Sequence, residues 1–355
     1  MRLAVEEARK GLGFTAPNPA VGALVVKDDH LLGKGWHAKA GQPHAEPLAL
    51  RDAGEAARGA DLYVTLEPCC THGKTPPCTE AIKAAGIRRV FIGCTDPNPA
   101  HAGRAYAILR EAGIEVFEEV LSGTCQELLR AFARVQRTGI PYVSLKLATS
   151  LDGRIADAAG TSRWITGPES RERVQAFRRE VDAILVGTET LRLDNPSLQP
   201  RPAEGHRPWR IVPDRTGSLP LTLKVFSDEN RDRTLCLLGP EAPADREQAL
   251  DPAGVAWMRV PAGPEGLLWA EILPELAKRS MHHILCEGGG KLSADLLSLR
   301  LVQEILWFQA PMLLGQRGRP AIAADILFAE APRLRRTAFE ALGDDLFARY
   351  LPTSS

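Results

Sequence analysis

Short apolar runs alternate with helical patterns twice along this chain of 355 residues, and no other feature constrains the fold as strongly. In the first half, four apolar runs predict strands, at 20–27, 62–66, 90–93 and 114–117. Helical patterns lie between and after these runs, at 45–57, 79–85, 104–112 and 125–136. Strands that alternate with helices are typical of an α/β sheet.

The alternation stops at Arg137-Thr-Gly-Ile-Pro141 and restarts immediately afterwards. We place a domain boundary there, which gives domains of residues 1–140 and 141–355. Domains commonly contain roughly 100–200 residues, so two domains suit the length of the chain. Seven apolar runs predict strands in the second domain, at 142–148, 183–187, 210–212, 234–237, 255–259, 283–286 and 304–310. Three helical patterns lie among them, at 169–179, 267–279 and 292–299. The second domain is therefore also predicted to be α/β.

Composition excludes several classes of protein. Lys plus Arg and Asp plus Glu number 44 each, which argues against a surface made for nucleic acid. The chain has no apolar run of roughly 18 residues and no apolar leader segment, so we expect no membrane partner and a cytoplasmic location. The seven cysteines are an odd number, and Cys69, Cys70 and Cys78 cluster, which indicates a metal or catalytic site in a reducing compartment.

A metal site is predicted from two short segments. The first is His44-Ala-Glu46, and the second is a loop with Pro68-Cys69 and Pro77-Cys78. One imidazole and two thiolates supply three zinc ligands and leave a fourth position open for water, as a catalytic zinc site requires. Zinc lowers the pKa of that water, and a carboxylate beside it can carry protons. We therefore predict zinc on His44, Cys69 and Cys78, with Glu46 as the proton carrier.

The spacing of these residues predicts where the helices begin. Side chains two residues apart on a helix point in nearly opposite directions, so His44 and Glu46 can share a site only if His44 precedes the helix. Pro43 agrees with such a boundary. Pro76-Pro77 likewise puts Cys78 at a helix start, where the helix dipole favours a thiolate.

Three alternatives remain open at this point. Cys70 or His72 could supply a fourth ligand and make the zinc site structural. The chain could be a nucleic-acid deaminase, since His-x-Glu with a later Pro-Cys is a general signature of zinc deaminases. That signature continues as Cys-x-x-Cys, whereas eight residues separate Cys69 from Cys78. The chain could also be a non-enzymatic zinc module with a degenerate second domain.

Both halves of the chain carry longer motifs that can be compared with those of known families. They are Pro17-Asn-Pro-Ala-Val-Gly22, Leu66-Glu-Pro-Cys69, Gly73-Lys-Thr-Pro-Pro-Cys78, Asp96-Pro-Asn-Pro99, Leu145-Lys-Leu-Ala-Thr-Ser-Leu-Asp-Gly153, Ser162-Arg-Trp-Ile-Thr166, Asp194-Asn-Pro196 and Glu287-Gly-Gly-Gly290. With these motifs the chain resembles, over nearly its whole length, the bifunctional deaminase/reductase family of riboflavin biosynthesis. The resemblance implies a cytidine-deaminase-like α/β/α domain followed by a dihydrofolate-reductase-like α/β domain.

The resemblance also implies an activity and a substrate. The family deaminates 2,5-diamino-6-(5-phosphoribosylamino)pyrimidin-4(3H)-one and then reduces the ribosyl group to ribityl with NADPH, giving 5-amino-6-(5-phosphoribitylamino)uracil. By resemblance, Asn18 and Lys74 hold the substrate of the first reaction. Many relatives carry histidine two residues after the first zinc cysteine, where this chain has Thr71; His72 follows one place later. The partner is thus a phosphorylated pyrimidine, and the family implies a homo-oligomer.

The second domain carries the implied reductase site. Glu287-Gly-Gly-Gly290 lies between a predicted strand and a predicted helix, where glycines and a helix start suit a pyrophosphate. By resemblance, the NADPH contacts are Ala148, Trp164, Thr190, Asp194, Gly289, Gly290, Lys291, Leu292, Ser293, Ala294 and Asp295. The implied substrate contacts are Ser162, Arg178, Leu198, Arg201 and Glu287. Lys146 and Asp194 are candidate polar participants at the reacting sugar. Taken alone, each arginine would be a solvated charge and Trp164 a core residue.

Overall fold

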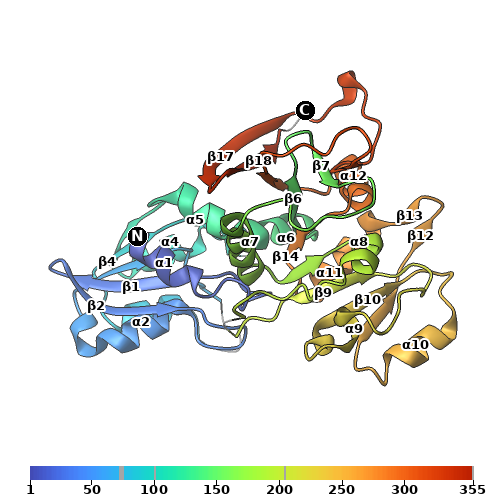
Figure 1. Cartoon of the computed structure of the whole chain (residues 1–355). Helices are drawn as coiled ribbons and strands as arrows, with labels where there is room; N and C mark the ends of the chain where they lie inside the picture. The colour runs from blue at the N-terminus through green and yellow to red at the C-terminus, as the bar shows by residue number, and fades with distance from the viewer. Residues whose placement is uncertain (72–75, 100, 204, 354–355) are drawn as a thin grey trace. The chain divides into compact units, whose positions relative to one another are not determined.

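The computed structural model describes residues 1–71, 76–99, 101–203 and 205–353, and it divides the chain into two compact units. Unit 1 is Met1–Ile140 and unit 2 is Pro141–Ser355. Each unit has its own sheet, coloured blue to cyan for unit 1 and green to red for unit 2 in Figure 1. No helix within the described ranges is long and apolar enough to cross a membrane.

Unit 1 is built on a five-stranded sheet in the order β2-β1-β3-β4-β5. Its strands are β1 (Gly22–Lys27), β2 (His30–Trp36), β3 (Asp61–Val64), β4 (Arg89–Ile92) and β5 (Glu115–Phe117). β1 pairs antiparallel with β2 and β3, whereas β3, β4 and β5 are parallel. Its helices are α1 (Arg2–Arg9), α2 (Ala45–Ala53), α3 (Cys78–Ala84), α4 (Arg104–Glu111), α5 (Ser122–Leu128) and α6 (Arg130–Thr138), with a short 3-10 turn η1 (Gly54–Ala57).

Glycines let the helices approach both faces of this sheet. A Cβ on Gly22 of β1 would lie 2.1 Å from the Ala4 carbonyl oxygen of α1. A Cβ on Gly35 of β2 would lie 2.5 Å from the Ala45 carbonyl oxygen of α2. Gly22 pairs with Trp36, the residue next to Gly35. Gly22 and Gly35 therefore face opposite sides of the sheet. The unit is therefore an α/β/α sandwich, with α1 and α2 on opposite faces.

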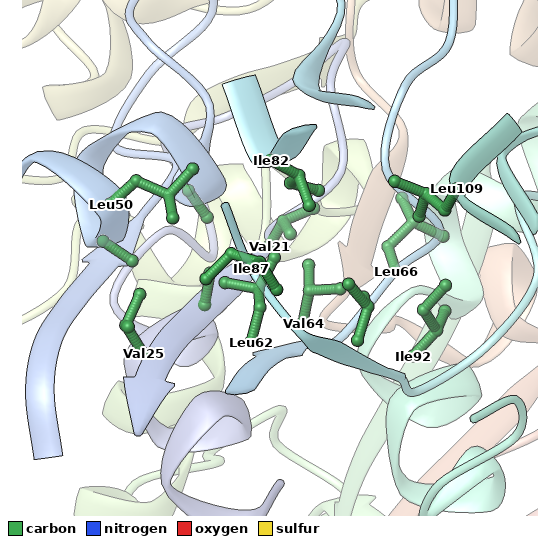
Figure 2. Packing of buried hydrophobic residues seen from close by; sticks show 14 of the residues in the cluster. Val21, Val25, Leu50, Leu62, Val64, Leu66, Ile82, Ile87, Ile92 and Leu109 are labelled. Atoms are coloured by element: carbon green, nitrogen blue, oxygen red, sulfur yellow. The ribbon is translucent and has the colours of Figure 1, made fainter. Parts of the chain in front are cut away.

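The core of unit 1 lies mainly between the sheet and α2, α3 and α4. Figure 2 shows strand residues such as Val25, Leu62 and Val64 packed with Leu50 of α2 and Ile82 of α3. Leu62, Val64 and Ile82 are fully buried. Burial of one such side chain stabilises the fold by about 1.5–3 kcal/mol.

The predicted elements of unit 1 are present, with two differences. The predicted helix at 125–136 is wrong as a single element, because the chain breaks at Leu129 (φ −97°, ψ 5°) into α5 and α6. α1 and β2 were not predicted. β2 reads His-Leu-Leu-Gly-Lys-Gly-Trp, and its two glycines resemble turn residues until α2 is seen lying against them.

Unit 2 is built on a nine-stranded sheet in the order β11-β10-β9-β8-β14-β6-β15-β18-β17. The first seven strands of that order are parallel, and β18 and β17 add an antiparallel hairpin. The strands are β6 (Tyr142–Thr149), β8 (Ala183–Leu185), β9 (Trp209–Pro213), β10 (Thr234–Leu238), β11 (Ala256–Arg259), β14 (His283–Cys286), β15 (Glu304–Gln309), β17 (Leu334–Leu342) and β18 (Asp345–Pro352). Two small pairs lie apart from it: β7 (Arg154–Ala156) with β16 (Arg319–Pro320), and β12 (Ala262–Gly263) with β13 (Gly266–Leu267).

Helices cover this sheet along its length (Figure 1). They are α7 (Pro168–Glu180), α8 (Thr188–Asp194), α9 (Lys224–Ser227), α10 (Ala244–Leu250), α11 (Trp269–Lys278) and α12 (Gly290–Ser298), with 3-10 turns η2 (Arg231–Arg233) and η3 (Phe328–Glu330). All seven strands predicted in this half are present. The hairpin of β17 and β18 was not predicted, because β17 is exposed along most of its length and lacks an apolar face.

Candidate functional site

The three predicted zinc donors of unit 1 meet at one edge of its sheet. The loop with Cys69 follows the carboxyl end of β3, and the chain that enters α2 follows the corresponding end of β2. The ligand atoms of His44, Cys69 and Cys78 all lie within 4.8 Å of one another. His44 Nδ1 is 3.5 Å from Cys69 Sγ and 3.3 Å from Cys78 Sγ. One imidazole and two sulfurs thus converge as zinc ligands must.

Helix starts place two of these donors as the sequence predicted. His44 is the extended residue before α2 (φ −69°, ψ 169°), so its side chain and that of Glu46 are not forced apart. Cys78 is the first residue of α3 and follows extended Pro77. The backbone N–H of Cys78 donates to Cys69 Sγ at 3.3 Å, which favours a thiolate on Cys69.

The electrostatics of the cluster favour one charged sulfur. The pKa of Cys69 falls to about 4, mainly because the Cys78 thiol donates a hydrogen bond to it, and the pKa of Cys78 is raised by the same bond. The pKa of His44 is raised, first by its hydrogen bond with Cys69. Glu46 is 3% exposed, and burial raises its pKa to about 7, with the Cys69 charge adding to the effect. Glu46 can therefore exchange a proton near neutrality.

Asn18 is held by a histidine that the sequence did not single out. His37 is 2% exposed, and its Nε2 lies 3.1 Å from Asn18 Nδ2. His37 Nδ1 lies 3.1 Å from the Pro43 carbonyl oxygen and donates to it, which leaves Nε2 as the acceptor for the Asn18 amide. Burial lowers the pKa of His37, consistent with a neutral ring. No motif marks His37, because its role depends on contacts 19 and 6 residues away.

The remaining sequence candidates of unit 1 are Cys70, His72 and Lys74. Cys70 is not part of the metal-binding group found among the described residues. Lys74 and His72, predicted as a substrate contact and as an alternative ligand, lie outside the described residues. The hypothesis of a fourth ligand from Cys70 therefore finds no support in the geometry.

Unit 2 has a pocket of about 1050 Å³ along the carboxyl edge of its parallel strands. Ligands of open α/β sheets bind at this edge. Twelve of the predicted contact residues line it, and they are Ala148, Ser162, Trp164, Arg178, Thr190, Asp194, Leu198, Arg201, Glu287, Gly289, Gly290 and Lys291. Leu292, Ser293 and Ala294 are buried on α12, and neither they nor Asp295 line the pocket.

The turn before α12 needs its glycines. Gly288 and Gly289 have φ of 75° and 103°, which side chains disfavour. A Cβ on Gly290 would lie 2.5 Å from the Pro320 carbonyl oxygen. The backbone of this turn therefore faces the pocket without side chains, at the start of a helix of nine residues that favours negative charge.

A buried ion pair lies in the lining of the pocket. Arg178 Nε and Nη2 donate to the two oxygens of Glu287 at 2.5 and 2.8 Å, and the side chains are 12% and 9% exposed. The charge of Arg178 contributes to lowering the pKa of Glu287 against the effect of burial. Lys146 of β6 also lines the pocket, and burial lowers its pKa while Glu287 opposes that shift. Glu287 is thus the anion shared by two cations.

A second group of contacts fixes the loop that carries Trp164. Ser162 Oγ donates to Asp194 at 3.0 Å, and Arg163 donates to the Asp194 carbonyl oxygen. Trp164 is 65% exposed, with the Arg171 guanidinium 4.9 Å from its ring centroid. Trp164 is therefore not a core residue, which excludes that alternative for it.

Several pocket residues were not predicted from the sequence. Arg163, Arg171, Lys224 and Arg319 all line the pocket and add positive charge to it. They belong to no glycine-rich or metal-binding pattern, and only the fold brings them to one pocket.

Family models divide the chain in the same way as its two sheets. Residues 1–94 match the cytidine and deoxycytidylate deaminase zinc-binding region, and residues 141–348 match the RibD C-terminal domain. The riboflavin biosynthesis protein RibD of Aquifex aeolicus is 39% identical over 99% of this chain and 98% of its own length. The chain belongs to the RibD family. The Escherichia coli RibD protein is 37% identical over 98% of this chain.

Solved RibD structures confirm the fold of the whole chain. Acinetobacter baumannii RibD superposes with a TM-score of 0.89 at 40% identity, covering 99% of this chain and 98% of that one. The Thermotoga maritima diaminohydroxyphosphoribosylaminopyrimidine deaminase/5-amino-6-(5-phosphoribosylamino)uracil reductase superposes with a TM-score of 0.88 at 36% identity, covering 99% and 97%. The family assigns to this chain a deaminase joined to a reductase of riboflavin biosynthesis, as the sequence motifs predicted.

Proposed function

We propose that residues 1–140 deaminate 2,5-diamino-6-(5-phosphoribosylamino)pyrimidin-4(3H)-one with zinc, and that residues 141–355 reduce the ribosyl group of the product with NADPH. The convergence of His44, Cys69 and Cys78 within 4.8 Å, beside the buried carboxylate of Glu46, is the observation that carries the first half. The whole-chain similarity to a protein named for both activities supports the pair.

The donor set of unit 1 fits zinc. One imidazole nitrogen and two sulfurs are ligands that Zn²⁺ prefers, and three protein ligands leave a position for water. Zinc bound there would supply a water molecule of lowered pKa. Glu46 would carry two protons in turn, one from the water to the ring nitrogen and a second from the attacking oxygen to the amino group that leaves as ammonia, which its raised pKa permits. Asn18, held by His37, would orient the pyrimidine ring.

The pocket of unit 2 fits a nicotinamide dinucleotide and a phosphorylated sugar. NADPH would supply the hydride when bound. The glycine backbone at 288–290 would face its pyrophosphate, and Trp164, Thr190 and Asp194 line the same pocket. Arg201 would bind the 5-phosphate of the substrate, since it lines the pocket and Arg178 is engaged by Glu287. The preference for NADPH over NADH rests on the resemblance to the family.

The test of the deaminase proposal is Glu46→Gln. We expect zinc content to equal that of the wild type and ammonia release from the pyrimidine to fall by about 10²-fold or more, the usual loss when a general acid–base is removed. Glu80→Gln is the matched control, because Glu80 lies in the first turn of α3 but is exposed and paired with Lys83. Ammonia release that persists in Glu46→Gln at full zinc content would show that Glu46 does not carry the protons.

The same assay separates the rival functions. A nucleic-acid deaminase would release ammonia from tRNA, and a purely structural zinc module would release none from any substrate. We expect release from the free pyrimidine alone.

We also propose that the chain forms a homo-oligomer. β17 is an exposed edge strand of nine residues with Phe339 55% exposed, and light scattering in solution tests the proposal.

A further inference from the structure

The carboxylate of Glu67 has contacts that the proposed chemistry does not use. Glu67 lies two residues before Cys69 and is 3% exposed. Its Oε2 accepts the backbone N–H groups of Asp96 at 3.1 Å and Gly103 at 2.8 Å. Its Oε1 accepts the backbone N–H of Ala105 at 2.9 Å. Three donors from one segment of chain therefore converge on a single buried carboxylate.

These bonds complete the start of α4. The first N–H groups of a helix have no partner within it, and Gly103, the residue before α4, has no side chain to supply one. Glu67 supplies the acceptor from another part of the sheet edge, and a negative charge is favourable at a helix start. The backbone N–H of Glu67 also donates to the Cys94 carbonyl oxygen at 2.9 Å. The backbone and the side chain of Glu67 thus tie the chain just before Cys69 to residues 94–96 and 103–105.

The segment held in this way contains Asp96-Pro-Asn-Pro99, a motif that has no role in the chemistry so far. Asp96 Oδ1 accepts the backbone N–H of Asn98 at 2.8 Å, which closes the turn. β3 and β4 are parallel neighbours, so the loop after β4 emerges at the same edge as the loop with Cys69. Burial raises the pKa of Asp96, and the charges of Glu67 and Cys69 add to the shift because both lie close by.

We propose that Glu67 is a positioning residue of the deaminase: it holds residues 96–99 and 101–105 against Pro68 and Cys69, so that they form a wall of the substrate site beside the zinc donors. The inference rests on the proposed deamination. The donors themselves have other supports, since the Cys78 N–H bonds to Cys69 Sγ and the Thr79 N–H bonds to the Cys69 carbonyl oxygen. Loss of Glu67 contacts should therefore weaken substrate binding more than it disturbs zinc.

Glu67→Gln in the full chain tests this role. The exchange puts an NH₂ group where a carboxylate oxygen accepted a hydrogen bond, so that at least one backbone N–H faces another donor. We expect KM for ammonia release to rise about tenfold or more, with kcat within about threefold and zinc content unchanged. A tenfold change corresponds to about 1.4 kcal/mol of binding free energy. Reduction of supplied deaminated intermediate should continue at the wild-type rate.

Glu119→Gln is the matched control. Glu119 is exposed and accepts two hydrogen bonds from Thr95, the residue before Asp96. One comes from the Thr95 backbone N–H at 3.3 Å and the other from the Thr95 hydroxyl at 3.2 Å. This variant should leave KM unchanged. Glu67→Asp keeps both carboxylate oxygens, so its KM should fall between the wild type and Glu67→Gln, and it serves if Glu67→Gln does not fold.

Three outcomes overturn the inference or its basis, and they are distinguishable. An unchanged KM in folded, zinc-loaded Glu67→Gln and Glu67→Asp overturns the positioning role. Parallel loss of zinc and kcat at unchanged KM also overturns it, because Glu67 would then support only the metal loop. Absence of zinc-dependent ammonia release from the wild type would instead refute the proposed function itself.

Discussion

Replacing Glu287 by alanine should destabilise unit 2 because it leaves two buried cations without their anion. Glu287 pairs with Arg178 through two hydrogen bonds at 2.5 and 2.8 Å, and its charge also supports that of Lys146. Two unit charges about 3 Å apart attract by about 5 kcal/mol at an effective dielectric constant of about 20. Removing one partner of such a pair typically costs about 3–5 kcal/mol.

The assay follows from where the tryptophans lie. Of the six tryptophans, five lie in unit 2 and only Trp36 lies in unit 1, so intrinsic fluorescence reports mainly on unit 2. A loss of about 3–5 kcal/mol should lower its Tm by about 6–20 °C for a domain of this size. Ammonia release by unit 1 should persist below the lowered Tm of unit 2. Reduction should be lost, since Glu287 lines the pocket that we propose for the reductase.

A double variant provides the control. Arg178→Met with Glu287→Leu removes both charges of the pair, and apolar replacement of a whole buried pair is often neutral or stabilising. The double variant should therefore be more stable than Glu287→Ala, although equally unable to reduce the substrate. If Glu287→Ala changes the unfolding free energy by less than about 0.5 kcal/mol, the value typical of a surface change, the reasoning about a buried pair is refuted.

Three further predictions concern zinc, pH and packing. Cys78→Ala should lose zinc and ammonia release, while reduction of supplied deaminated intermediate continues. Metal analysis and assays of both activities check this prediction, and loss of both activities in a folded protein would contradict the independence of the two sites. Burial raises the pKa of Asp182 to about 7, so Asp182 is more easily protonated in the fold than in the unfolded chain, and stability is lost as pH rises towards 7. Asp182→Asn should remove that loss and gain on the order of 2 kcal/mol at pH 8 relative to pH 5, measured by urea unfolding. Gly22→Ala should destabilise unit 1 by at least about 2 kcal/mol, because the new Cβ would lie 2.1 Å from the Ala4 carbonyl oxygen. The control is Gly123→Ala in α5, whose Cβ meets nothing within 4 Å, and it should be neutral or stabilising.

Much of the fold followed from local pattern. The strands of both α/β units, other than short, exposed or glycine-rich ones, appear near the predicted positions because their apolar runs are buried in a sheet. α5 and α6 were merged because the break at Leu129 has no proline or glycine to mark it. β2 and the hairpin of β17 and β18 were missed because packing or pairing, not periodicity, defines them.

The sequence by itself predicted that His44, Cys69 and Cys78 would converge near Glu46, because short spacings and the prolines before His44 and Cys78 fix which side chains can share a helix start. Only the tertiary structure decided the rest of the two sites. The contact of Glu67 with Ala105 and that of Arg178 with Glu287 join residues 38 and 109 positions apart. Such contacts depend on how strands order themselves in a sheet and how helices pack on it, and no local pattern in the chain records that order.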